Sequence, residues 1–277
     1  MVRVKIVALM AVLASALVLA LSPADLALFW LGKTPAPAPE VRTLAEALDF
    51  QAAFVEQLIP LAGEPVGYKV GLTSRPVQKK FGVDHPLRGV LLRRMLLDGD
   101  AVVPAKFGAV PIAEADLMVR VRDAGINGAR NPQEVLEHLD AVIPFIELPD
   151  LMLKKGEPLT AATITAINVG ARLGVLGRPI PVEATPEFAR ALAEMQVYVS
   201  VDGALVMKVP GKAILGHPLN AVIWLAKDLA RNGGALRAGD LISLGSLGRP
   251  LRPRAGQTLW VAYSFGRWGG EVKVRFE

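Results

Sequence analysis

Three acidic residues, Glu114, Asp116 and Glu147, are the side chains of this sequence with the clearest potential for shared chemistry. Glu114 and Asp116 lie in residues 113–121, where apolar residues alternate with others as in a half-buried strand. Because side chains alternate across a strand, the two acids are expected on the same face. Glu147 directly follows the apolar run 143–146, which also predicts a strand.

Carboxylates that meet in an apolar setting repel one another and are costly to desolvate. Either the three acids stay apart in solvent, or a divalent cation joins them. Ligation by oxygen alone suits Mg²⁺ or Mn²⁺ rather than zinc. Acids that alternate along a strand are more often its solvated face. The spacing therefore leaves a metal site and an exposed strand face as alternatives.

The composition excludes several other classes of protein. The 277 residues are 52% hydrophobic, enough for the core of one large domain. There is no cysteine, which rules out disulfides, thiolate metal sites and cysteine nucleophiles. The three histidines are too scattered to suggest a zinc site. Net charge is +5 with dispersed basic residues, so no nucleic-acid partner is expected.

The first residues differ from the rest of the chain. Arg3 and Lys5 precede residues 6–21, which carry no charge, and small residues follow. A basic start, a long apolar stretch and small residues form the pattern of a secretory signal. We therefore predict a signal peptide or signal anchor over residues 1–32.

Residues 33–41 alternate proline with alanine and predict a stiff, extended linker. The sequence leaves cleavage of the signal open. Without cleavage, residues 6–31 would tether the protein to a membrane, with the basic end in the cytoplasm and the domain outside it. The expected location is thus export, with a domain that is periplasmic or membrane-anchored facing the periplasm.

The rest of the chain predicts many strands with helices between them in no regular alternation, which indicates an α+β fold with a rolled or sandwich sheet. Asp202-Gly203 is a strong hairpin signal between two strands. Helix starts are expected at Thr43, Asn131, Thr160, Thr185 and Pro218. Strands are expected in 67–74, 89–97, 101–103, 173–177, 196–201, 204–209, 239–246, 258–264 and 271–276.

Six short motifs then occur in a characteristic order: Gly67-Tyr-Lys-Val-Gly-Leu-Thr-Ser74, Phe81-Gly-Val-Asp-His-Pro86, Glu114-Ala-Asp116, Phe145-Ile-Glu-Leu-Pro-Asp150, Leu215-Gly-His-Pro-Leu219 with Trp224-Leu225, and Gly239-Asp-Leu-Ile-Ser-Leu-Gly-Ser246. From about residue 42 to the C-terminus the chain resembles the 2-oxopent-4-enoate (2-keto-4-pentenoate) hydratases and 4-oxalocrotonate decarboxylases of the fumarylacetoacetate hydrolase superfamily.

The resemblance implies a catalytic domain over residues 42–277, built as a mixed β-roll or sandwich of the fumarylacetoacetase C-terminal-domain type with peripheral helices. It also implies a Mg²⁺- or Mn²⁺-dependent enzyme of aromatic catabolism, acting on short 2-oxo or dienol carboxylates and assembled as a homo-oligomer. The family's metal ligands fall on Glu114, Asp116 and Glu147, with Asp116 in place of a longer glutamate. Its active-site lysine falls on Lys69, where partial burial beside a metal would suit proton transfer.

Three further residues are predicted to bind substrate. Arg88 could hold the substrate carboxylate bidentately, although an arginine-rich stretch is more often a solvated face. Asn168 falls in the stretch that matches the family's Asp-Asn-x-Ser. Ser246 ends the motif that resembles the family's Gly-Ser turn near substrate, although turn chemistry alone would also explain it.

The sequence departs from the family pattern at several polar positions. Leu87 and Ile167 stand where the family has acids, Gly170 replaces a hydroxyl residue, and Arg94 replaces another acid. The predicted metal ligands and the lysine are retained. These losses bear on the reaction more than on the fold.

The resemblance favours a hydratase of 2-hydroxypenta-2,4-dienoate-type 2-oxo acids, a lyase that acts through an enolate on the metal with Lys69 as proton shuttle. A decarboxylase and an acylpyruvate-type C–C hydrolase would use the same electron sink, so the metal ligands do not distinguish them. A rival of another class is an exported, non-catalytic protein that binds small carboxylates.

Overall fold

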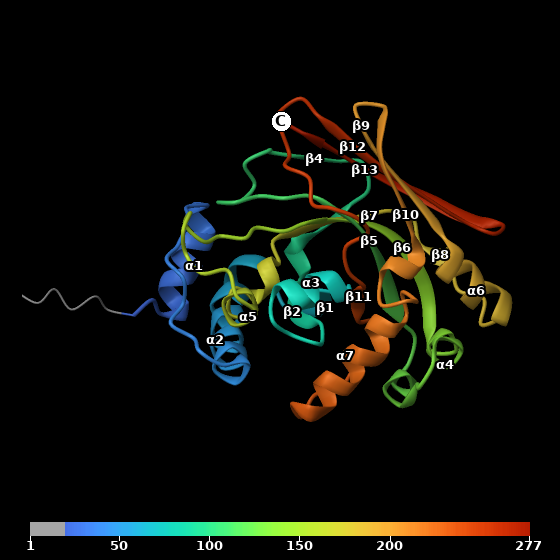
Figure 1. Cartoon of the computed structure of the whole chain (residues 1–277), viewed down its shortest axis with the longest axis horizontal. Coiled ribbons are helices and arrows are strands. Elements are labelled where there is room, and N and C mark those ends of the chain that lie inside the picture. Colours follow the sequence, from blue (N-terminus) through green and yellow to red (C-terminus); the bar gives the residue numbers. More distant parts are fainter. Residues whose placement is uncertain (1–19) are drawn as a thin grey trace, which may run out of the picture.

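The computed structural model describes residues 20–277 (Figure 1). Its strands form two sheets. The first has eight strands in the order β2-β1-β11-β5-β6-β7-β3, with β8 paired to β6, and the second has five in the order β10-β9-β12-β13-β4. The strands are β1 (Pro65–Gly71), β2 (Leu87–Leu92), β3 (Leu96–Asp98), β4 (Ala101–Val103), β5 (Glu114–Val121), β6 (Leu139–Leu148), β7 (Leu173–Leu176), β8 (Ile180–Pro181), β9 (Gln196–Val201), β10 (Ala204–Pro210), β11 (Leu241–Ser243), β12 (Thr258–Phe265) and β13 (Trp268–Phe276).

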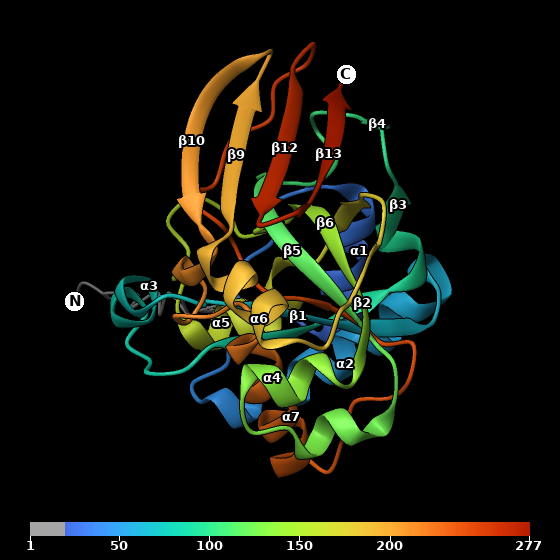
Figure 2. The ribbon, with the colours of Figure 1, turned by 90° about the vertical axis from the view of Figure 1, so that its right-hand side faces the viewer.

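Helices surround the larger sheet. Figure 2 shows the five-stranded sheet rising at one end of the molecule while helices gather towards the other. The main hydrophobic core contains residues of both sheets and of α6 and α7. The expected α+β fold with peripheral helices is therefore confirmed. The helices are α1 (Pro23–Gly32), α2 (Leu44–Ala62), α3 (Arg75–Lys80), α4 (Pro132–Leu136), α5 (Ala161–Ala166), α6 (Pro186–Glu194) and α7 (Asn220–Arg231).

Side-chain caps set most of the helix starts, as the sequence predicts. Thr43, Asn131, Thr160 and Thr185 each accept a hydrogen bond from the backbone N–H three residues later, and each helix begins at the next residue. The cap satisfies a backbone donor that has no partner within the helix. The strands of the Asp202-Gly203 hairpin pair as expected, with both turn residues at positive φ.

The N-terminal segment differs from the sequence prediction. Residues 1–19, most of the predicted signal, lie outside the described residues. The remainder of the predicted signal, from residue 23, forms α1. Its Leu26 and Trp30 are buried in a second hydrophobic cluster with Phe54 and Leu58 of α2. This part of the chain belongs to the globular domain because its apolar face has a partner.

The predicted linker, residues 33–41, also packs on the domain. Ala36 is fully buried and pairs with Leu153 as an isolated β-bridge. The backbone N–H of Ala38 donates to Glu157 Oε2 at 3.1 Å. The segment is extended, as predicted, but these contacts hold it in place, so it is not a free spacer. Among residues 20–277, no helix is both long and apolar enough to cross a lipid bilayer.

Candidate active site

Neighbouring antiparallel strands bring two of the predicted acids together. In the register of β5 and β6, Glu114 lies directly opposite Glu147, whereas Asp116 lies opposite Phe145. Such cross-strand partners have their Cβ atoms about 4.5–5.5 Å apart. Both strands are central to the larger sheet and buried on both faces. Asp116 is 0% exposed and Glu147 4%, whereas Glu114 at the start of β5 is half-buried, so the alternative of a solvated strand face is wrong for Asp116 and Glu147.

Lys69 reaches the same place from β1. It is only 3% exposed, its Nζ forms an ion pair with Glu147 Oε1, and it donates to the carbonyl oxygen of Val169 at 2.9 Å. The predicted lysine and two of the predicted acids therefore share one buried cluster. The carbonyl contact and the ion pair together fix the position of the ammonium group.

The acids strongly influence one another. Burial, followed by the charge of Glu147, raises the pKa of Glu114 to about 7, although Lys69 and a hydrogen bond from Ser246 oppose the rise. Burial and the charge of Glu147 also raise the pKa of Asp116 to about 8, against hydrogen bonds from Ser243 and two backbone N–H groups. Without a cation the cluster therefore holds protons near neutral pH, because several buried negative charges cannot coexist cheaply.

Asp116 is also fixed by hydrogen bonds. Its Oδ1 accepts from the backbone N–H of Leu117 (2.5 Å) and Gly245 (2.9 Å), and its Oδ2 accepts from Ser243 Oγ (2.5 Å). Ser243 ends β11, which pairs with β5. The sequence motif 239–246 already grouped Ser243 with Ser246 as resembling the family's Gly-Ser turn, but it did not predict the bond from Ser243 to Asp116.

Ser246 and Asn168 both lie at the cluster, in different roles. The Ser246 hydroxyl lies close enough to the carboxyl of Glu114 to lower its pKa, while its Oγ donates to the Gly248 carbonyl at 3.3 Å. Asn168 is fully buried, and its amide accepts from the N–H of Val90 (2.7 Å) and donates to the carbonyl of Val90 (2.9 Å). The Asn168 side chain therefore fastens its loop to β2, which holds the neighbouring Val169 carbonyl against Lys69, and it is not free to contact substrate.

Arg88 is the predicted site residue that the structure does not bring to the cluster. It pairs with Val70 across β1 and β2, while Lys69 pairs with Gly89, so Arg88 and Lys69 point to opposite faces. Its Nε forms a salt bridge with Asp228 of α7 at 3.1 Å. The structure thus places Arg88 away from the cluster, and its contact with a substrate carboxylate stays a prediction.

Tyr263 was missed by the sequence analysis. It reaches over from β12, is buried, and its hydroxyl lies within hydrogen-bond distance of the carbonyl oxygens of Asp116 and Phe145, which compete for its one proton. The alternating pattern of β12 marks this position only as core, so nothing local in the sequence indicated the contact. The positions Leu87 and Ile167, where acids were expected from the family, are also buried in apolar clusters.

The cluster fits a divalent cation in part. Within residues 20–277, the buried Glu147 Oε1 has the Lys69 ammonium as its one polar partner. Glu114 faces it across the strand pair. In the part of the chain that the structure describes, however, no three Asp, Glu or His side chains converge as a ligand group. Glu114 and Glu147 could hold a cation, whereas most of the Asp116 lone pairs are already in use.

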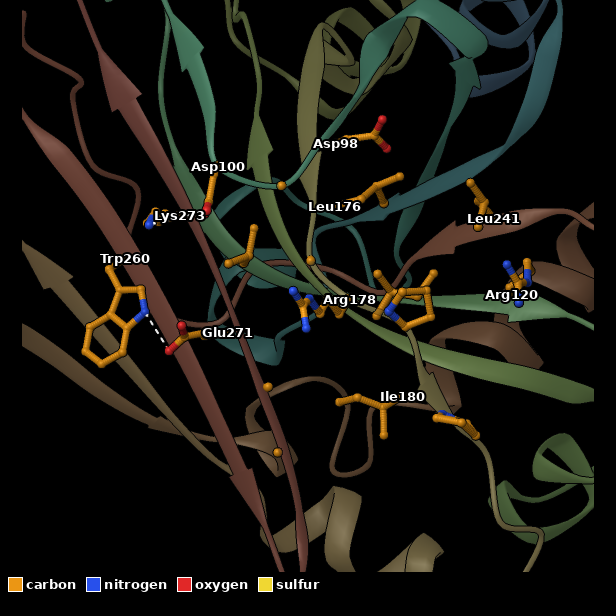
Figure 3. A pocket seen from close by; sticks show the side chains of 18 of the residues that line it. Asp98, Asp100, Arg120, Leu176, Arg178, Ile180, Leu241, Trp260, Glu271 and Lys273 are labelled. Atoms are coloured by element: carbon orange, nitrogen blue, oxygen red, sulfur yellow. Dashed lines mark hydrogen bonds and ion pairs between the residues drawn. The ribbon is translucent and has the colours of Figure 1, made fainter.

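A cavity lies away from the acidic cluster. It has a volume of about 1070 Å³ and lies between β5, β6 and β13, with Arg178, Ile180 and Trp260 among its lining residues (Figure 3). Trp260 Nε1 donates there to Glu271 at 3.1 Å. None of the predicted site residues lines it.

The chain is similar to several known proteins. The chain is 34% identical to the 2-keto-4-pentenoate hydratase of Paraburkholderia xenovorans over 214 residues, which cover 76% of this chain and 77% of that protein. The chain belongs to the 2-keto-4-pentenoate hydratase family. Another member, the 2-oxo-hept-4-ene-1,7-dioate hydratase of Escherichia coli, is 32% identical, with 86% and 88% of the two chains covered. No protein-family profile matches the chain.

Solved structures agree with this hydratase-family assignment. The 4-oxalocrotonate decarboxylase of Pseudomonas putida G7, complexed with magnesium and adipate, superposes with a TM-score of 0.77 at 26% identity and covers 89% of this chain. Fumarylacetoacetate hydrolase family proteins, such as one from yeast with a TM-score of 0.53, share the fold at 14% identity. The superfamily expected from the six motifs is confirmed.

Proposed function

We propose that the protein is a divalent-metal-dependent hydratase of 2-hydroxypenta-2,4-dienoate-type 2-oxo acids. The observation that carries the proposal is the buried cluster in which Lys69 contacts Glu147 and Glu147 faces Glu114. The family members at 32–34% identity that are named hydratases favour this reaction.

Each residue of the cluster has a defined task. Glu114 and Glu147 would hold the cation, which we expect to be Mg²⁺ or Mn²⁺ because all ligands are oxygen. Bound there, the cation would supply Lewis-acid stabilisation of negative charge on the 2-oxo group of the substrate. Lys69 would carry the proton to and from substrate carbon, since the Val169 carbonyl and Glu147 hold its Nζ in place. Ser246, which lies beside Glu114, would orient its carboxylate by turning its hydroxyl from the Gly248 carbonyl to that group.

The reaction can be followed by the ultraviolet absorbance of the dienol. Incubation of 2-hydroxypenta-2,4-dienoate with the protein and Mg²⁺ should remove the dienol band, and chelation should stop the loss. A thermal shift without any loss of the band would contradict catalysis and favour a small-carboxylate-binding protein.

A decarboxylase is the second candidate, because the structural neighbour with a TM-score of 0.77 is a 4-oxalocrotonate decarboxylase. The buried apolar residues Leu87 and Ile167 leave fewer acids to activate water, which also weakens the case for hydration. Release of CO₂ from 4-oxalocrotonate at a higher kcat/KM than dienol hydration would favour decarboxylation. Release of pyruvate from an acylpyruvate would instead indicate a C–C hydrolase.

We also propose export, because Arg3 and Lys5 precede the uncharged residues 6–21. Fusion of residues 1–41 to a phosphatase that is active only in the periplasm should give periplasmic activity. Activity confined to the cytoplasm would contradict export. Light scattering of the purified protein would test the expected homo-oligomer.

A further inference from the structure

Asp116 differs from Glu114 in both reach and surroundings. Glu114 is the cross-strand neighbour of Glu147, whereas Asp116 is two residues further along β5, which is about 6.6 Å. The aspartate side chain is also one methylene shorter than a glutamate. Three of its roughly four lone-pair positions already accept hydrogen bonds from Leu117, Gly245 and Ser243.

The partners of Asp116 lie in the turn that carries Ser246. Backbone bonds flank Asp116 on either side. The Leu117 carbonyl accepts from the N–H of Leu244 at 2.9 Å, and the Ala115 carbonyl accepts from the N–H of Leu247 at 2.7 Å. Residues 243–247, the serine turn, are thus attached to β5 by backbone bonds at both ends and by the Asp116 carboxylate at the centre.

The serine turn has little freedom to follow Asp116 elsewhere. Gly245 has φ +117°, and a Cβ there would lie 2.1 Å from Thr73 Oγ1. Ser243 is fully buried. If the Asp116 carboxylate turned away, the Ser243 hydroxyl and the Gly245 N–H would lose their acceptor in a dry environment, which is unfavourable.

We propose that Asp116 is a positioning residue and not a cation ligand: its carboxylate fixes the serine turn so that Ser246 reaches Glu114, and Glu114 and Glu147 hold the cation. This inference rests on the proposed metal-dependent function. It also accounts for the absence of three converging acids among residues 20–277.

Mn²⁺ titration of the metal-free protein, followed by electron paramagnetic resonance, tests this role with two matched carboxylate-to-amide changes. Glu114→Gln should weaken Mn²⁺ binding by more than about 100-fold, because loss of a ligand exceeds the roughly 10–100-fold effect of an outer partner. Asp116→Asn should weaken it by less than about 10-fold, at the lower end of that range. A loss in Asp116→Asn as large as in Glu114→Gln would overturn the inference and leave the metal site intact.

A positioning role also predicts coupling to Ser246. Asp116→Asn and Ser246→Ala should lower kcat/KM by similar factors, and the double variant should lose no more than the worse single variant. Multiplied losses would overturn the inference. If Asp116→Asn does not fold, Ser243→Ala replaces it as the test. Unchanged Mn²⁺ affinity with a lower Tm would support the positioning role. An increase in Mn²⁺ affinity of about 10-fold or more would show that Asp116, once released from Ser243, binds the cation, and would overturn the inference.

If the proposed function itself is wrong, the Mn²⁺ titrations give a different pattern. If the wild-type protein binds no Mn²⁺, or Glu114→Gln binds it normally, both the metal-dependent function and the role of Asp116 are overturned. If only Asp116→Asn departs from expectation, the function stands and the inference falls.

Discussion

Lys69 and Glu114 lie in one cluster, but substitutions at the two positions should have different effects on turnover and metal binding. Lys69 contacts Glu147 and the Val169 carbonyl, so its removal takes away one positive charge and, under the proposed function, the proton carrier. Glu114 faces Glu147 directly, so under the proposed function its removal would take away a cation ligand. The two roles can be separated by measuring turnover and metal binding in the same preparations.

We predict that Lys69→Met lowers kcat by about 10²- to 10⁴-fold, the usual contribution of a positioned acid or base. Cation affinity should not weaken, because a competing positive charge beside Glu147 is lost. Steady-state kinetics with a Mn²⁺ titration measure both quantities, with the exposed Lys106→Met as control. A drop in cation affinity that matches the drop in kcat would count against Lys69 as the proton carrier.

Glu114→Gln should abolish turnover and its dependence on metal together, because the amide cannot replace a charged ligand. Dienol absorbance with and without chelator measures this. Wild-type-like activity of the variant in the presence of chelator would reject the metal mechanism.

At the scale of elements, α1 is attached by contacts that join distant parts of the chain. The guanidinium of Arg172 stacks over the ring of Trp30, with Cζ 3.7 Å from its centroid, and Nη1 donates to the Trp30 carbonyl at 2.7 Å. Arg172 begins the approach to β7, beside the loop of Asn168. The N-terminal helix therefore supports the layer that holds the Val169 carbonyl against Lys69.

Trp30→Ala should destabilise the domain by about 3 kcal/mol, near the lower end for a buried Trp-to-Ala change. The buried Arg172 would lose its aromatic partner at the same time. Chemical unfolding gives the free energy, and Leu28→Ala is a matched control because Leu28 on the same helix is 67% exposed. Equal stability of the two variants would mean that α1 is only loosely attached.

How well the sequence predicts a contact depends on how many positions separate its two residues along the chain. The cap at Thr43 and the turn at Asp202-Gly203 depend on neighbours within a few residues, so local patterns found them. The bond from Ser243 to Asp116 spans 127 positions, and that from Tyr263 spans 147. No local pattern encodes such pairs, and the face on which Arg88 lies depends on its register with β1.

At the scale of the whole molecule, the acids couple stability to pH. The folded pKa values of Glu114 (about 7) and Asp116 (about 8) lie above their ordinary values of 4.5 and 3.8. Between these limits the folded protein binds more protons than the unfolded chain, so its stability falls as pH rises. A cation binds the deprotonated acids and should offset that loss.

We predict that the Tm of the metal-free protein falls between about pH 5.5 and about pH 9, and falls less in Glu114→Gln, which lacks one of the titrating groups. The increase in Tm on adding Mg²⁺ should be larger at the higher pH. Scanning calorimetry with chelator or Mg²⁺ gives both values. A wild-type slope no steeper than that of the variant would show that these acids do not control the pH dependence.

The packing of residues 33–41 has a mechanical consequence. Nine free extended residues would give a reach of about 30 Å and a wide choice of orientations. Because Ala36 is bridged to Leu153 and α1 is packed through Trp30, residues 33–41 lack that conformational freedom. A partner fused ahead of Ser22 would therefore be attached at the docked helix α1, and residues 33–41 would add nothing to its reach.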